Sequence, residues 1–346
     1  MTDRSLPASA RVQLPGSQTH DISVVIVSYN TRELTIECVR SVLADSEGLA
    51  VEVIVVDNQS SDGSSEALST QFPGITVIDS PANGGFAYGN NIGFEHCHGR
   101  YVLLLNPDTR VKQSSMRRCV ELMGADPEIG VIGATVRTED GELDPTLIRF
   151  YSLRHFAYNV LFPARIMSRS TRLGDPRYAG LDRTCRQNVD AVAGCFMFTR
   201  REVLEDAGGL DTRFFMYGEE VEWCFRVRQA GYEIVYDPAV EIVHVGGAST
   251  AGASEWQEIE TMRGHILFLL LTNGSIAARG GSALMVAREL LRSPYYAGQI
   301  AMNRFTPTEG SRKWLAKIRF AFRSVLDPPR GQTIGLPGRG GDRHVG

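Results

Sequence analysis

The amino-acid sequence predicts an α/β fold with a doubly wound, mainly parallel sheet. In the first half of the chain, short apolar segments alternate with helix-length segments, and crossover helices of this length join parallel strands. Val102 to Leu105 is apolar at every position, as in a strand that is covered on both faces. Pro107 cannot continue a ladder, so this strand ends with Asp108 at the edge of the sheet.

The first four strands are indicated by runs of apolar and β-branched residues. They are expected at residues 22–27, 51–56, 75–78 and 101–105. Helix-type spacing predicts the connecting helices. These are expected at residues 32–43, from the Ser-Asp-Gly of 61–63 to about 70, and at about 86–97.

The second half of the chain is less regular. A helix is expected over 112–125 and a strand over 130–136, after which the pattern fades between 141 and 188 into a polar, Arg-rich stretch. We interpret that stretch as a variable insert near the substrate. Regular segments then return: strand-like at 189–198, 233–236 and 240–245, and helical at 201–207 and 219–229. Beyond residue 255 the chain is predicted to be mainly helical.

The composition is that of a soluble globular protein, with 43% hydrophobic and 22% charged residues and a net charge of −4. A net negative charge does not indicate general nucleic-acid binding. The six cysteines are widely spaced without a CxxC pair, which favours buried free thiols in a reducing compartment over disulfides or zinc. No signal-peptide pattern is found in residues 1–20, and the longest apolar run, 266–271, is too short to span a bilayer. We therefore expect a cytoplasmic protein.

The C-terminal 36 residues are basic, with eight lysines and arginines against two aspartates. Apolar residues fall on one side of a predicted helix there: Trp314, Leu315, Ile318, Phe322, Val325 and Leu326. Arginines and lysines occupy the other sides, which is typical of an interfacial helix on anionic lipid. A helix that docks on its own domain would show the same pattern, so both interpretations stay open.

Asp108 and His244 are the candidate metal ligands. A carboxylate at the C-terminal end of a strand lies where open α/β sheets bind ligands, and its oxygen suits a divalent cation that holds phosphates. His244 ends a strand-like run just before Gly246-Gly247, which would allow a ligand to approach closely. Alternatively, Asp108 caps the following segment and His244 is an ordinary polar residue at a strand end.

Two further segments suggest a nucleotide site. Ser28, Tyr29 and Asn30 follow the first strand, and Asp57 follows the second, where it could accept a hydrogen bond from a base or ribose. The Gly-rich segment 83–93 could cradle phosphates, although it is neither GxGxxG nor a P-loop. Turn chemistry and a Gly-rich helix start are the structural alternatives.

Three carboxylates, Glu219, Glu220 and Glu222, lie at the start of a predicted helix beside aromatic residues. Clustered like charges raise the proton affinity of at least one member, which suits a general base. The N-terminus of a helix opposes this because it stabilises anions. A solvated acidic first turn is the alternative.

Taken together and in sequence order, these segments resemble family-2 glycosyltransferases of the GT-A fold, specifically the rhamnosyltransferase-like branch. The resemblance covers about residues 21–250. It is carried by VVIVSYN (24–30), VIVVDNQSSDGS (53–64), NGGFAYGNNIG (83–93), YVLLLNPDT (101–109), VAGCFMFTRR (192–201), GGLDTRFFMYGEEVEWCFRVRQAG (208–231) and VHVGGAS (243–249). It implies a GT-A catalytic domain with a nucleotide-binding half over about 21–110 and an acceptor half over about 111–250. A disordered lead-in (1–20), a helical extension (251–327) and a disordered tail (328–346) complete the expected organisation.

The resemblance also assigns roles to single residues. Asp108 matches the metal-binding carboxylate of the family's Asp-x-Asp motif, Asn106 stands at its first position, and His244 matches a histidine metal ligand. Glu220 matches the catalytic base, usually Asp in this branch, with Glu219 as the alternative. Tyr29, Asn30 and Asp57 match the nucleoside pocket, and Asn83 and Asn90 match positions near the nucleotide and the donor sugar.

The activity implied by the resemblance is an inverting glycosyl transfer that depends on Mn²⁺ or Mg²⁺. The implied donor is dTDP-L-rhamnose and the implied acceptor a cell-surface polysaccharide or lipid-linked glycan. A UDP-hexose or UDP-N-acetylhexosamine donor is an alternative, because thymine and uracil present the same edge to Asp57. A catalytically inactive nucleotide-sugar-binding module is another. The missing GxGxxG disfavours a Rossmann oxidoreductase. If the basic helix is interfacial, the enzyme is peripheral on the inner face of the plasma membrane.

Overall fold

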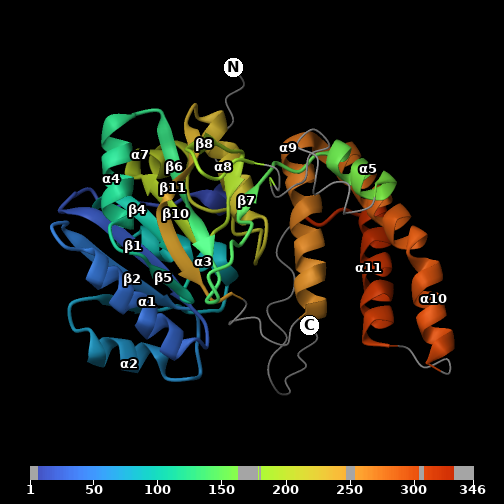
Figure 1. Cartoon of the computed structure of the whole chain (residues 1–346), viewed down its shortest axis with the longest axis horizontal. Helices are drawn as coiled ribbons and strands as arrows, with labels where there is room; N and C mark the ends of the chain where they lie inside the picture. The colour runs from blue at the N-terminus through green and yellow to red at the C-terminus, as the bar shows by residue number, and fades with distance from the viewer. Residues whose placement is uncertain (1–6, 163–177, 179–180, 247–253, 304–307, 331–346) are drawn as a thin grey trace.

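The computed structural model describes residues 7–162, 178, 181–246, 254–303 and 308–330. An α/β part contains most of the chain, and a group of helices lies beside it (Figure 1). The described strands form a nine-stranded sheet in the order β3-β2-β1-β4-β10-β6-β11-β5, with β8 (Gln187–Asn188) paired to β11. A small second sheet pairs β7 (Leu147–Ile148) with β9 (Ala191–Val192).

One half of the sheet is parallel. Its strands are β1 (His20–Ser28), β2 (Val51–Asp57), β3 (Thr76–Asp79) and β4 (Gly99–Leu105). The interiors of β1, β2 and β4 are apolar and buried because helices cover both faces, whereas the edge strand β3 is only partly buried. The C-terminal ends of these strands meet at one edge, where Ser28 is in register with Asp57. The predicted fold class is thereby confirmed.

The connecting helices pack tightly on this half. They are α1 (Arg32–Asp45), α2 (Ser64–Gln71) and α3 (Gly85–Phe94), whereas α4 (Ser115–Ala125) follows the parallel strands and packs on the other half of the sheet. A β-carbon added at Gly89 of α3 would lie 2.6 Å from Cγ1 of Val27. Glycine at this position therefore lets α3 approach the sheet closely.

The other half of the sheet is mixed. β10 (Phe196–Arg200) runs antiparallel between β4 and β6 (Ile129–Arg137). β11 (Glu233–His244) is parallel to β6 and antiparallel to β5 (Thr109–Val111). The sequence predicted two short strands where β11 is one strand with a register shift between Tyr236 and Glu241. It did not predict β5 at all.

Two more helices complete the α/β part, α7 (Arg201–Ala207) and α8 (Glu219–Gln229). The neighbouring helical group contains α5 (Leu153–Leu161), α9 (Ser254–Leu291), α10 (Ser293–Met302) and α11 (Glu309–Leu326). The helical geometry of α9 is broken at Gly274, where φ is 85°. A separate apolar core with Phe156, Leu269 and Ala321 joins α5, α9 and α11. Among the described helices, none combines the length and the apolar character needed to cross a membrane.

Some expectations for the ends of the chain need correction. Part of the lead-in is ordered: the amide of Gly209 donates to the carbonyl of Ala10, and that of Thr212 donates to the carbonyl of Ser9. The insert 141–188 contains α5, which its weak pattern had not indicated. Most of the expected disordered tail, 331–346, lies outside the described residues. Five cysteines are buried free thiols, as predicted, and Cys185 is exposed.

Candidate active site

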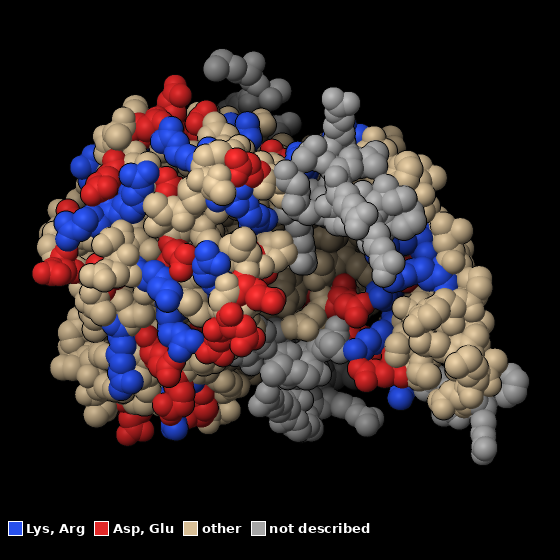
Figure 2. All heavy atoms as spheres, viewed as in Figure 1, with Lys and Arg blue, Asp and Glu red and all other residues tan. Residues whose placement is uncertain are grey.

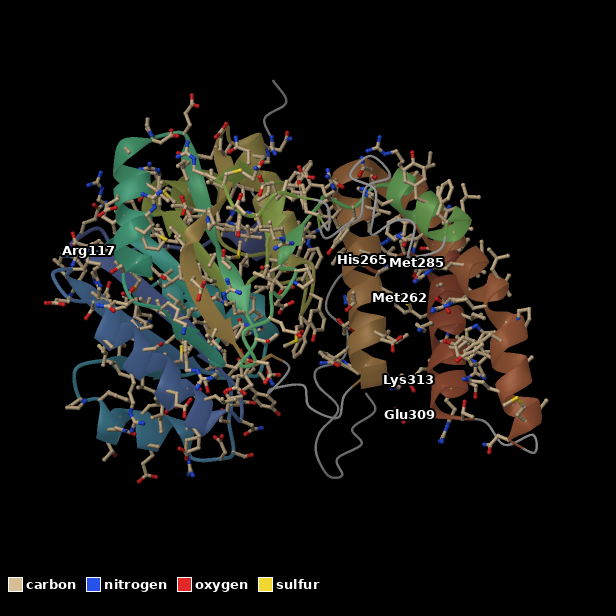
Figure 3. All side chains as sticks on the ribbon, in the orientation of Figure 1. Arg117, Met262, His265, Met285, Glu309 and Lys313 are labelled. Carbon is tan, nitrogen blue, oxygen red and sulfur yellow. The ribbon has the colours of Figure 1, made fainter. Side chains whose placement is uncertain are left out.

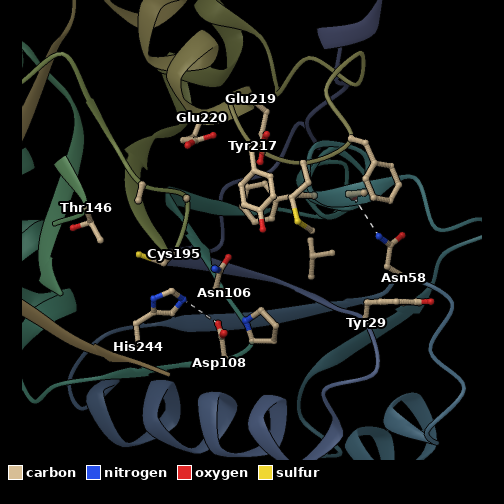
Figure 4. Close-up of a pocket in the computed structure, with 18 of the residues that line it drawn as sticks. Tyr29, Asn58, Asn106, Asp108, Thr146, Cys195, Tyr217, Glu219, Glu220 and His244 are labelled. Atoms are coloured by element: carbon tan, nitrogen blue, oxygen red, sulfur yellow. Dashed lines mark hydrogen bonds and ion pairs between the residues drawn. The ribbon is translucent and has the colours of Figure 1, made fainter. Parts of the chain in front are cut away.

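A cavity of about 400 Å³ opens at the C-terminal edge of the parallel strands (Figure 4). Side chains from both halves of the sheet line it. Those predicted from the sequence are Tyr29, Asn83, Asn106, Asp108, Glu219, Glu220 and His244. The structure therefore gathers seven of the eleven candidate residues around one space, although they are spread over more than half of the chain.

Asp108 and His244 form one wall of this cavity. Asp108 follows β4, and β5, which begins at the next residue, pairs with the end of β11 so that His244 lies opposite Thr109. The amide of Val245 also donates to the carbonyl of Asp108 at 3.0 Å. As a result, His244 Nε2 lies 3.2 Å from Asp108 Oδ1, and both side chains are largely buried. Figure 4 shows this pair below the cavity.

A second carboxylate flanks the imidazole. Asp144 Oδ2 lies 3.8 Å from His244 Nδ1. Burial by itself would lower the pKa of His244, but the adjacent Asp108 and Asp144 raise it to about 9. The imidazole therefore occupies a position that favours positive charge.

The donor atoms on this wall fit a divalent cation. Two ligands about 2.1 Å from one ion and at right angles to each other lie about 3 Å apart, close to the observed separation of Asp108 Oδ1 and His244 Nε2. Within the described residues, Asp108 Oδ1 and His244 Nε2 pair with each other but have no further hydrogen-bond partner. No group of three protein ligands occurs in the described part of the chain. Two protein ligands leave room for phosphate oxygens and water, as is usual for Mg²⁺ with nucleotides.

Glu219 and Glu220 lie on the opposite wall, at the start of α8 (Figure 4). The preceding residues Tyr217 and Gly218 have φ values of 70° and 102°, and this left-handed turn directs the start of the helix into the cavity. Burial raises the pKa of both carboxyl groups, and the neighbouring charge of Glu220 raises that of Glu219 further. For Glu220, backbone amides at the helix N-terminus oppose this rise. The pair is therefore not the solvated acidic turn that the sequence left open.

Polar side chains at the ends of β1 to β4 line the third side. Tyr29, Asn83 and Asn106 reach the cavity. Asn58, which the sequence did not single out, also lines it and donates from Nδ2 to Asn83 Oδ1 at 2.9 Å. Asp57 lies just behind: its Oδ2 accepts from the amide of Ser60, while its buried Oδ1 has no partner among the described residues.

The structure does not bring the remaining candidates to the cavity lining. Ser28 is fully buried and its hydroxyl bonds with Thr31 and Thr35. Asn30 is exposed and accepts from the amide of Ser61. Asn90 is 1% exposed; its Nδ2 donates to the carbonyl of Phe86 inside α3, and its Oδ1 has no hydrogen-bond partner among the described residues.

The sequence missed the cavity residues of the insert. Asp144, Pro145, Thr146 and Ile148 line the side near His244. The only local signal was the Asp-Pro pair after the turn at Gly141, and it gave no reason to expect contact with a distant histidine. This part of the insert therefore lies at the cavity.

A comparison with known families matches residues 23–208 to the model described as glycosyl transferase family 2. The match covers more than half of the chain. The chain belongs to glycosyl transferase family 2. It is a glycosyltransferase, as the resemblance implied.

Two relatives carry rhamnosyltransferase names. The N-acetylglucosaminyl-diphospho-decaprenol L-rhamnosyltransferase of Mycobacterium tuberculosis is 28% identical over 212 residues, which cover 58% of this chain and 68% of the relative. The rhamnosyltransferase WbbL of Escherichia coli is 25% identical over 230 residues, covering 64% of this chain and 83% of WbbL.

Solved structures show the same fold. The mannosyltransferase PcManGT from Pyrobaculum calidifontis, in complex with GDP-Man and Mn²⁺, matches with a TM-score of 0.53 at 18% identity, over 91% of this chain and 90% of that one. S. aureus TarS 1-349 in complex with UDP-GlcNAc matches with a TM-score of 0.52 at 14% identity, over 88% and 81% of the two chains. The GT-A fold of this family-2 glycosyltransferase is thereby established.

Proposed function

We propose that this glycosyltransferase is inverting and metal-dependent, and that it transfers L-rhamnose from dTDP-L-rhamnose to a cell-surface polysaccharide or a lipid-linked glycan. One observation carries the proposal: Asp108 and His244 face Glu219 and Glu220 across a single cavity. A direct displacement at a sugar carbon needs the leaving phosphate on one side and the base on the other. The rhamnosyltransferase names of the relatives support the donor sugar.

The wall with Asp108 and His244 would bind the diphosphate end of the donor. These residues offer one oxygen and one nitrogen donor 3.2 Å apart. A divalent cation bound there would neutralise charge on the departing nucleoside diphosphate. Support for a cation comes from the fit of the two donor atoms and from the Mn²⁺ in the PcManGT complex.

Glu220 would act as the general base. Glu220 is half-buried, and desolvation raises the pKa of its carboxyl group, which brings it nearer to the working pH. The acceptor hydroxyl oxygen forms the new bond to the anomeric carbon, the bond from that carbon to the diphosphate oxygen breaks, and the hydroxyl proton moves to Glu220. This single displacement inverts the configuration and needs no covalent intermediate on the protein.

The nucleoside would lie against the ends of β1 and β2. Tyr29 offers an aromatic face at the cavity, and the free Oδ1 of Asp57 could accept from the base. Asn58 and Asn83 are linked by a hydrogen bond and would line the path toward the phosphates. None of these residues distinguishes thymine from uracil, so a UDP-sugar remains the alternative donor.

The arrangement of the helical group supports the proposal that the protein binds a membrane surface. α11 docks on α9 through Ala321 in the shared core, Trp314, which donates to the carbonyl of Glu289, and Lys317, which pairs with Glu258. Leu315, Phe322 and Leu326 face away, with 40%, 59% and 67% of their surface exposed. Arg312, Arg319 and Arg323 are exposed as well. One side of α11 therefore packs against α9, while the other side is exposed and could contact a membrane.

Exposed apolar residues concentrate in this region. Of the thirteen large apolar side chains exposed among the described residues, eight lie on α9 after Gly274, α10 and α11. Figure 2 shows a largely uncharged surface over α10, whereas charges of both signs are interspersed on the α/β part. We propose that the outward face of α11, defined by Leu315, Phe322, Leu326 and the three arginines, rests on an anionic bilayer beside a lipid-linked acceptor.

A thermal-shift panel tests the donor and the metal. The full chain is heated with dTDP-L-rhamnose, UDP-glucose or UDP-N-acetylglucosamine, each with and without Mn²⁺. We expect the largest rise in Tm with dTDP-L-rhamnose, and only when Mn²⁺ is present, because a ligand that binds the folded state stabilises it. A larger shift with a UDP-sugar would support the alternative donor. Binding without transfer to any acceptor glycan would support an inactive binding module.

A further inference from the structure

Two carboxylates flank the His244 ring, each at a different nitrogen. On one edge of the ring, Nε2 lies 3.2 Å from Asp108 Oδ1. On another edge, Nδ1 lies 3.8 Å from Asp144 Oδ2. Asp144 also lines the cavity. The imidazole therefore faces the proposed cation site with one nitrogen and an acidic residue of the insert with the other.

Main-chain hydrogen bonds hold Asp144 in this place. Its amide donates to the carbonyl of Val136 at 2.9 Å. Val136 of β6 is in register with Ile242, two residues before the end of β11. On the other side of Asp144, the amide of Ala193 donates to the carbonyl of Thr146 at 2.9 Å. The sheet thus fixes the position of Asp144 beside the end of the strand that carries His244.

Nδ1 of His244 is a buried polar atom that needs an acceptor. Among the described residues it has no hydrogen-bond partner, and a buried N–H without an acceptor costs free energy. When Nε2 binds a cation, the one proton of the neutral ring is on Nδ1. Metal-binding histidines almost always donate this second N–H to a carboxylate, a backbone carbonyl or water, which fixes the orientation of the ring. Asp144 supplies a carboxylate on that side.

Asp144 is not placed as a third metal ligand. No group of three side-chain ligands occurs in the described part of the chain. Asp144 faces Nδ1, whereas the cation would bind between Asp108 and Nε2. Its side chain is also 37% exposed, against 7% for Asp108. Its effect on a cation should therefore pass through His244.

We propose that Asp144 is a positioning residue for His244: it accepts the Nδ1–H and holds the ring with Nε2 directed to the cation. The inference rests on the proposed function, in which Asp108 and His244 bind a divalent cation. It gives the part of the insert around Asp144 a role in metal binding.

Mn²⁺ binding by the Asp144→Ala variant tests the proposal. The full chain is titrated with Mn²⁺ at a fixed concentration of dTDP, and the free ion is measured by electron paramagnetic resonance. We expect the dissociation constant of Mn²⁺ to rise about tenfold to a hundredfold, as for other residues that orient a metal ligand. The main-chain bonds of Asp144 remain in this variant, so the fold should persist. If it does not, Asp144→Leu, which fills the space of the carboxylate, provides the same test.

Asp140→Ala is the matched control. It removes the same negative charge at an exposed position four residues earlier, and it should bind Mn²⁺ as the native protein does. A native dissociation constant in Asp144→Ala, or an equal rise in Asp140→Ala, would overturn the proposal.

A double variant shows whether Asp144 acts through His244. In the His244→Ala background, the change Asp144→Ala should cause no further loss of Mn²⁺ affinity, because two residues that act as a unit are not additive. A further loss of about tenfold would show that Asp144 binds or attracts the cation independently of the imidazole, and the proposal would fall.

Electron spin-echo spectroscopy of bound Mn²⁺ reports the orientation of the ring. Among the described residues that line the cavity, His244 is the only histidine. His265 of α9, labelled in Figure 3, points toward α5, where its ring lies 6.0 Å from that of Phe156. At saturating Mn²⁺, the nitrogen modulation from His244 should weaken in Asp144→Ala while the phosphorus coupling from dTDP stays. Unchanged nitrogen modulation would contradict a positioning role.

The test separates this inference from the proposed function. Asp108→Asn is titrated in parallel under the same conditions. Native Mn²⁺ affinity in Asp108→Asn would show that the metal site is assigned wrongly and would remove both. Lost affinity in Asp108→Asn together with native affinity in Asp144→Ala would refute the role of Asp144 alone.

Discussion

His244 Nε2 lies 3.2 Å from Asp108 Oδ1, although the two residues come from segments far apart in the sequence. Two backbone features fix this distance. The short strand β5 starts just after Asp108 and pairs with the end of β11, and the amide of Val245 donates to the carbonyl of Asp108. Both donor groups are therefore placed by main-chain hydrogen bonds rather than by the flexible ends of long side chains.

Asp108→Asn should abolish metal-dependent nucleotide binding. The amide keeps the size of the side chain but removes the negative charge that a divalent cation requires. We expect the affinity for dTDP in the presence of Mn²⁺ to fall to the level measured without metal, by isothermal titration calorimetry. Glu139→Gln, at an exposed residue paired with Arg110, is the control and should bind as the native protein does. Unchanged affinity in Asp108→Asn would refute the metal role.

Glu220→Gln should separate binding from chemistry. The variant cannot accept the acceptor's proton, and a general base typically contributes a factor of about 10² to 10⁴ in rate. We expect kcat to fall by that factor while the dissociation constant of the donor stays near the native value. Glu219→Gln should lower kcat less. A larger loss in Glu219→Gln would transfer the role of base to Glu219.

The parallel half of the fold and most of the site could be predicted because the signals are local. Tyr29, Asp57 and Asp108 lie at or just beyond the ends of apolar strands, so they must come to one edge of a parallel sheet. The position of Asn90 could not be predicted in this way. A polar residue in a Gly-rich helix start is equally compatible with a ligand contact and with the hydrogen bond to the Phe86 carbonyl that the structure shows.

Contacts between distant segments account for what the sequence did not indicate. The pairing of β5 with β11 and the approach of Asp144 to His244 depend on how the second half of the chain returns to the sheet. The packing of Gly264 against Tyr217 likewise joins two segments whose local patterns are independent. Helical periodicity predicts α11 but not which of its sides packs against α9. The pattern places Trp314 with Leu315 and Phe322, which face outward, whereas in the structure Trp314 Nε1 donates to the carbonyl of Glu289 on α9.

Gly264→Ala should impair transfer without preventing donor binding. Alanine normally stabilises a helix relative to glycine, but here its β-carbon would push the Tyr217 carbonyl and the turn that carries Glu220. A misplacement of about 1 Å can cost about a hundredfold in rate, so kcat should fall by about tenfold to a hundredfold. Gly298→Ala on α10 meets no atom within 4 Å and is the matched control. Equal rates in the two variants would contradict this account of the turn.

The outward face of α11 should bind anionic vesicles. In cosedimentation, the full chain should pellet with vesicles that contain phosphatidylglycerol and remain in the supernatant with pure phosphatidylcholine. Replacing Leu315 and Phe322 with serine should reduce pelleting, and high salt should weaken it because exposed charges are screened. Leu43→Ser, at an apolar residue of α1 with 43% exposure, should pellet as the native chain does. Native pelleting of the Leu315/Phe322 double variant would exclude this face as the contact.

Electron spin-echo spectroscopy of Mn²⁺ bound together with dTDP most directly tests whether Asp108 and His244 hold one cation at the donor's diphosphate. The account predicts nitrogen modulation from an imidazole ligand and phosphorus coupling from the nucleotide in the native protein. In His244→Ala, the nitrogen modulation should disappear. Bound Mn²⁺ without nitrogen modulation in the native protein, or with the same modulation in His244→Ala, would contradict the central claim.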